Sequence, residues 1–105
     1  MKTEIIVHAP EFVTEREFIE TEIEKNMNGK LDSYLKKYTN PDAECRLEVT
    51  LERVKKEDNN KDPEFNGKVI LSVDGNSFRS EREGFKRLDD LVSHLFTHVK
   101  EQMAK

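Results

Sequence analysis

The segment CRLEVTLERV, residues 45–54, alternates between apolar and polar side chains. Successive side chains of a β-strand point to opposite faces of the sheet, so this pattern predicts a strand with one buried face and one face in water. The residues on the buried side are Cys45, Leu47, Val49 and Leu51. A chain with such a strand needs a cover on one face of its sheet and can leave the other face open.

Two other segments have the composition of strands. Residues 3–9, TEIIVHA, are rich in β-branched side chains and stop before Pro10, and residues 68–76, KVILSVDGN, alternate again. The stretch before the latter, KKEDNNKDPEFNG at residues 55–67, is rich in turn-forming residues and too polar to be buried. We expect a flexible hairpin loop over residues 55–67.

The final strand is expected to be short. The Asp74-Gly75 dipeptide favours a tight hairpin, and the segment SFRS, residues 77–80, follows it. Ser80 and Glu83 then match a capping box, the pair of side chains that often starts a helix. The strand should therefore end where this helix begins.

Two segments have the spacing of amphipathic helices. In residues 13–38 apolar side chains recur at every fourth position, and Thr14 with Glu17 matches a capping box. Gly29 weakens the middle of this helix, because glycine costs roughly 1 kcal/mol relative to alanine. Residues 84–103 form a second apolar stripe. The stripes consist of Ile19, Ile23, Met27, Leu31 and Leu35 in the first helix and of Phe85, Leu88, Leu91, Val92, Leu95, Phe96 and Val99 in the second.

The order of these elements predicts the fold. A helix between the first two strands makes them parallel, and short connections make the remaining strands an antiparallel meander. Both helices then cover one face of a four-stranded mixed sheet. We therefore expect one α+β domain over residues 1–105, a two-layer sandwich with the order β-α-β-β-β-α.

The sequence contains few signs of catalysis or cofactor binding. It has no GxGxxG, GxxxxGK[ST], GxSxG or HExxH motif, so we expect neither an enzyme nor a bound cofactor. His94 and His98 have the spacing of two metal ligands on a helix, but no third ligand is designated and we expect no metal. The lone Cys45 is expected to be a small buried side chain. Because no run of about 18 apolar residues and no signal peptide occurs, we expect a cytoplasmic protein.

Charge is spread unevenly along the chain. The net charge of −4 argues against indiscriminate nucleic-acid binding. Residues 76–105, however, contain more basic than acidic side chains. The polar side of the last helix has two rows with basic members, one containing Arg87 and both histidines, the other Lys86 and Lys100. Such rows beside a groove between helices suit salt-sensitive phosphate contacts, and the alternative is a solvated helix surface.

Several segments resemble the ribosome hibernation-promoting factor and ribosome-associated inhibitor family, also called protein Y. They are VTEREF, KLDSYLKKY, CRLEVTLERVKK and, above all, FKRLDDLVSHLFTHVKEQ. In that family the last helix begins near a Tyr-Ala-Ala-Ile-Asp run, whose Tyr, Ile and Asp correspond to Phe85, Leu88 and Asp89. The resemblance covers essentially the whole chain. It is greatest to the short members, which lack the additional domain that pairs ribosomes.

This resemblance implies a non-enzymatic protein that binds the small ribosomal subunit in the channel for messenger and transfer RNA and silences idle ribosomes. It implies contacts between 16S-type ribosomal RNA and basic residues of the helices and strand ends. Thr97 and Glu101 stand where the family usually has basic residues. We expect the RNA contacts to come from Lys30, Lys37, Arg79, Arg82, Lys86, Arg87, His94, His98 and Lys100.

A different class of function remains open at this stage. A protein-interaction module of the same fold would bind a protein partner through the open sheet face or through the 55–67 loop. That loop is nearly neutral, with three lysines against four acidic residues, and gives this alternative little support. The expected partner is therefore the small ribosomal subunit, with no membrane and no small-molecule substrate.

Overall fold

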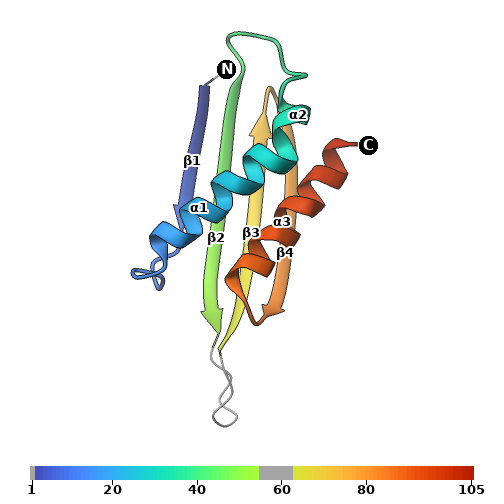
Figure 1. Ribbon diagram of the computed structural model, residues 1–105. Helices are drawn as coiled ribbons and strands as arrows, with labels where there is room; N and C mark the ends of the chain where they lie inside the picture. The colour runs from blue at the N-terminus through green and yellow to red at the C-terminus, as the bar shows by residue number, and fades with distance from the viewer. Residues whose placement is uncertain (1, 55–62) are drawn as a thin grey trace.

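The computed structural model describes residues 2–54 and 63–105 and has the predicted order β-α-β-β-β-α. The sheet order is β1-β2-β3-β4, with β1 parallel to β2 and the other neighbours antiparallel. Figure 1 shows both long helices on one face of this sheet, which confirms the two-layer α+β sandwich. The elements are β1 (Lys2–His8), α1 (Arg16–Asn26), η1 (Met27–Leu31), α2 (Asp32–Leu35), β2 (Glu44–Val54), β3 (Glu64–Val73), β4 (Asn76–Phe85) and α3 (Leu88–Met103).

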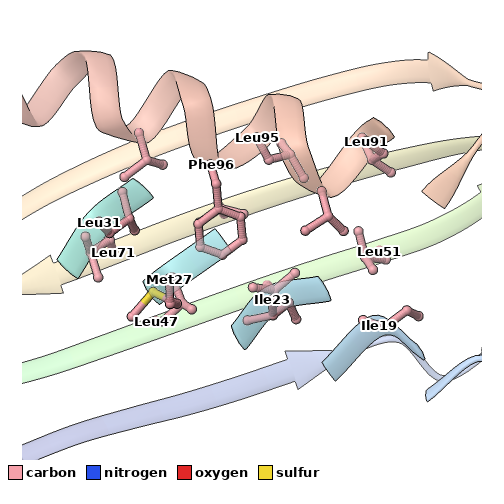
Figure 2. Packing of buried hydrophobic residues seen from close by; sticks show 14 of the residues in the cluster. Ile19, Ile23, Met27, Leu31, Leu47, Leu51, Leu71, Leu91, Leu95 and Phe96 are labelled. Atoms are coloured by element: carbon pink, nitrogen blue, oxygen red, sulfur yellow. The ribbon is translucent and has the colours of Figure 1, made fainter. Parts of the chain in front are cut away.

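The strand register places the apolar side chains of the sheet in one layer. Leu47 of β2 lies opposite Ile5 of β1 and Leu71 of β3. Paired residues of neighbouring strands share a face, so the alternating residues point together at the helices. Figure 2 shows Leu47, Leu51 and Leu71 beneath the apolar side chains of the helical segments. The core therefore lies between the sheet and one layer of helices, as the alternation predicts.

The first helical segment contains a π-helical turn that compensates for the spacing of its apolar residues. In an α-helix a step of four residues turns about 40° past a full turn, so four such steps add up to about 160°. A single α-helix could not point both Ile19 and Leu35 into one core. The π-helical turn η1, Met27–Leu31, holds more residues per turn and removes part of this drift. All five apolar residues of the stripe are consequently at most 9% exposed.

Neither predicted capping box forms. Helix α1 begins at Arg16, and Thr14 Oγ1 donates to the Glu15 carboxylate at 2.6 Å instead of capping a backbone N–H. Phe12 is fully buried and fixes the chain before the helix. The Glu15 carboxylate is directed to Arg53 of β2, 3.6 Å away, so tertiary contacts set this helix start.

The last strand is longer than predicted, and the second capping box is wrong because Ser80 lies within it. Strand β4 spans Asn76–Phe85 and pairs with β3 along its length, and α3 begins only at Leu88. The charged segment SEREG has little strand propensity, and its pairing with β3 overrides that deficit. Ser80 is 1% exposed and faces α3 rather than starting it.

The connections before and after β3 can be compared with the predicted loop and the predicted hairpin where the structure describes them. Asp74 and Gly75 have φ values of 46° and 82° and join β3 to β4, which confirms the tight hairpin. The predicted 55–67 loop falls largely on residues 55–62, which lie outside the described residues. Its last residues, 64–67, belong to β3.

The two edges of the sheet differ. Gln102 of α3 reaches the outer edge of β4, where its Oε1 accepts from the Arg79 N–H at 3.2 Å and its Nε2 donates to the Arg79 carbonyl. This side-chain amide occupies the outward backbone groups of Arg79 as a neighbouring strand would. In residues 2–54 and 63–105, no contact of this kind covers the outer edge of β1.

Candidate nucleic-acid interface

Lys30 joins the first helical segment to α3. Its ammonium donates to the Ser93 carbonyl and the Ser93 Oγ, both at 2.8 Å, and to the Thr97 Oγ1 at 2.9 Å. An ammonium has three N–H donors, so these contacts use all of them. Every acceptor is neutral, and the positive charge of Lys30 is therefore not cancelled by its own partners.

A shallow hollow beside Lys30 forms what we call the interhelical groove. Its volume is about 330 Å³, and its lining residues are Glu22, Lys25, Asn26, Gly29, Lys30 and Ser93. Ser93 and Thr97 lie on one side of α3 because residues four apart in a helix are neighbours. The turn of η1 directs Lys30 toward that pair.

Positive charge accumulates on this side of α3. Burial lowers the pKa of Lys30, and the nearby positive charge of Lys100 lowers it further. Lys25 pairs with Glu22 at 3.5 Å. Among the residues that the structure describes, neither Lys30 nor Lys100 forms an ion pair. The positive charges of Lys30 and Lys100 are consequently not neutralised by a carboxylate within this part of the chain, and they can attract an anion from solution.

The two histidines lie away from this groove. His98 is half-buried against β4, with Nδ1 3.2 Å from the Ser80 Oγ. His94 is exposed, with Nδ1 2.8 Å from the Asp90 carbonyl and its ring 5.0 Å from that of Phe85. Within the described residues, no group of three His, Cys, Asp or Glu side chains is arranged to hold a metal ion.

Lys86 and Arg87 each form an ion pair with a nearby carboxylate. Lys86 Nζ lies 3.2 Å from Glu64 Oε1. Arg87 makes a bidentate contact with Asp89, at 3.0 Å from Nε and 2.7 Å from Nη2. This hydrogen-bonded contact raises the pKa of Arg87 and lowers the pKa of Asp89. Phosphates would have to compete with these carboxylates for both cations.

The remaining predicted residues lie in three different places. Lys37 follows α2, with its ammonium 5.2 Å from the centre of the Tyr34 ring. Arg79 pairs with Ile70 in the ladder, so its side chain is on the open sheet face, opposite the helices. Arg82 lies near the end of β4 and donates from Nη1 to the Glu81 carbonyl at 2.8 Å.

The structure thus brings together Lys30 and Lys100 and separates them from Arg79 and the histidines. Sequence reasoning missed Ser93 and Thr97 as partners of Lys30. The available signal was their spacing of four in the polar row that also contains Lys100. Thr97 accepts a hydrogen bond from Lys30.

Comparison with known protein families and with curated proteins found no match for this chain. None of the helices in the described residues is both long enough and apolar enough to cross a membrane. Cys45 is 1% exposed, and burial raises the pKa of its thiol, as expected for a small core side chain.

Proposed function

We propose that this protein binds the small ribosomal subunit at the channel for messenger and transfer RNA and silences translation in the cytoplasm during stress. Its contacts to 16S-type ribosomal RNA would come from the interhelical groove and from Lys100 of α3 beside it. The observation that carries the proposal is the adjacency of Lys30 and Lys100 without an ion pair among the described residues. The β-α-β-β-β-α fold agrees with the one that the sequence resemblance implies.

The two lysines would act differently on a phosphate backbone. Lys30 has no donor left, so it contributes a fixed positive charge. Lys100 is exposed and donates no hydrogen bond to a side chain or backbone group among the described residues, so its ammonium can contact a phosphate oxygen directly. Together they create a local attraction in a molecule whose net charge is −4.

A silencer of this kind needs no catalytic group. Occupying the channel excludes messenger and transfer RNA, so the function depends on affinity and position alone. The predicted contact residues other than Lys30 and Lys100 carry less of this proposal. Lys86 and Arg87 have carboxylate partners, and Arg79 is on the opposite face of the sheet.

Sedimentation with purified small subunits and whole ribosomes, over a range of salt concentrations, tests the proposal. We expect the protein to co-sediment at low salt and to dissociate steeply as salt rises, because phosphate contacts release counterions. Removing one phosphate contact with Lys100→Gln should lower the slope of log affinity against log salt by about 1. Arg79→Gln removes the same charge from the open sheet face and should leave the slope unchanged.

Two results would count against the proposal. Failure to co-sediment at low salt would remove ribosome binding and leave the protein-interaction module as the alternative. Equal losses with Lys100→Gln and Arg79→Gln would mean that the surface around the interhelical groove and Lys100 is not the docking surface.

A further inference from the structure

The outer edge of β1 can accept another strand. In residues 2–54 and 63–105, the backbone of β1 pairs with β2 alone. An unpaired edge offers a row of N–H and C=O groups to an incoming extended chain. Ile5, on the helix side of this strand, is 47% exposed. Figure 1 shows that α1 crosses the sheet obliquely, with the N-terminal part of β1 beside it rather than under it.

Two hollows adjoin this edge. The larger, of about 420 Å³, has apolar walls from Met27, Leu35 and Tyr38. The smaller, of about 320 Å³, lies beside Val7. Both are bounded by Ile5 and Glu24, and no residue of α3 lines either one. They are therefore separate from the interhelical groove, which α3 helps to form.

The carboxylates that line these hollows from the helical side differ in whether they form ion pairs. Glu20 pairs with Arg16 at 3.0 Å, and Asp32 pairs with Lys36 at 3.2 Å. Glu24, which borders both hollows, forms no ion pair with any described residue. One uncompensated negative charge thus lies where the two hollows meet.

We propose that the β1 edge binds an extended segment of a partner protein by strand addition. Alternate side chains of the added strand would face the helices, about 6.6–6.8 Å apart along the strand. An apolar side chain fills the hollow walled by Met27 and Leu35. A lysine or arginine two positions away enters the hollow beside Val7 and pairs with Glu24. Backbone hydrogen bonds provide the affinity, and these two side chains provide the specificity.

This binding site lies beyond the proposed ribosomal function and does not depend on it. Its ligand is a polypeptide with a basic side chain, whereas the interhelical groove attracts an anion. The two surfaces lie on different sides of α1, because Lys25 lines the groove and Glu24 lines the hollows.

Synthetic threonine-rich peptides test the proposal. Two probes carry leucine and arginine two positions apart, in either order, so that both strand directions are sampled. Amide chemical shifts of the full chain follow the titration. We expect shifts centred on β1 and α1, and about fivefold weaker binding when glutamate replaces the arginine of the peptide. N-methylation of the peptide amides that face β1 should abolish binding.

A matched pair of protein variants makes the test specific. Glu24→Lys should favour the glutamate peptide over the arginine peptide. Glu17→Lys makes the same charge change at an exposed position of α1 outside both hollows and should leave the original preference intact. Equal effects of the two variants would overturn the proposal, as would shifts centred elsewhere or undiminished binding of N-methylated peptides. Shifts of β1 that depend on protein concentration without peptide would identify a second copy as the occupant instead.

Discussion

Gly67 lies in β3 beneath α3, at a position where a side chain has no room. A Cβ there would stand 2.8 Å from Leu95 Cδ1, 2.9 Å from Leu51 Cδ2 and 3.3 Å from Leu91 Cδ2. These leucines are at most 1% exposed, so they have little freedom to move aside. A side chain at this position would therefore force these leucines to shift within the packing between sheet and helix.

Gly67→Ala should lower the free energy of unfolding by about 1–3 kcal/mol, the usual cost of adding a methyl group to a filled core. Gly29→Ala is the matched control, because a Cβ at that helical position meets nothing within 4 Å. Alanine there should stabilise the protein by about 0.5–1 kcal/mol. Urea denaturation of both variants measures the two changes, and destabilisation by Gly29→Ala would contradict this account.

The contact between Arg87 and Asp89 predicts a pH-dependent contribution to stability. The contact lowers the pKa of Asp89 below its ordinary value of 3.8. A carboxyl with a lowered pKa in the folded state stabilises the fold above the unfolded pKa, and this stabilisation is lost as pH falls through the folded pKa. Asp89 also lies in the first turn of α3, where a negative charge favours the helix.

Asp89→Asn should therefore destabilise the protein at neutral pH and have a smaller effect below pH 3.8. Urea denaturation at both pH values measures the difference between the parent protein and the variant. Glu101→Gln, which neutralises an exposed carboxylate in the C-terminal half of α3, controls for a general effect of charge. A difference that stays constant with pH would exclude the ion pair as its source.

At the scale of single elements, η1 explains how a helix with apolar residues at every fourth position can bury all of them. Deleting the exposed Asn28 shortens the step from Met27 to Leu31 to three residues. On an α-helix a step of three residues falls about 60° short of a full turn, so it offsets the drift of the other steps. The whole stripe then fits within about 80° on an ordinary α-helix. The π turn becomes unnecessary.

We therefore expect deletion of Asn28 to leave the protein folded, with a free energy of unfolding within about 1 kcal/mol of the parent. Deletion of the exposed Thr21 is the control, because it lies in α1, where no π turn can absorb the change. Deletion of Thr21 rotates Ile19 by about 100° around the helix axis and out of the core. The free energy of unfolding should fall by about 1.5–3 kcal/mol, the usual gain from burying such a side chain. Equal costs for the two deletions would mean that η1 does not serve to align the stripe.

The elements that could be predicted from the sequence are those with a clear period. Alternation defined β2 and β3, and the spacing of apolar residues defined both long helices. Strand β4 was predicted too short, since its charged second half gains its conformation from pairing with β3. Phe12 escaped prediction as a core residue because it lies in a connection without periodicity. It is fully buried, with its ring 5.8 Å from that of Phe65.

At the scale of the whole molecule, topology followed from the order of elements, whereas the candidate interface did not. A helical wheel separates the polar rows of α3 but cannot tell which row faces a neighbouring helix. Lys30 and its acceptor Ser93 are 63 positions apart, and only the packing of η1 against α3 joins them. The register between β3 and β4 puts Arg79 on the far face, although the sequence grouped it with the other basic residues.

The difference between the two sheet edges also limits the size of any assembly built by strand addition. Gln102 already occupies the outward backbone groups of Arg79, so a newcomer at β4 must first displace it. If strand addition takes place at β1 alone, the stoichiometry is one added strand per chain. Two chains joined through β1 would present β4 at both ends, and growth would stop at the pair. We therefore expect edge-to-edge association through β1 to stop at the pair rather than to propagate into fibres.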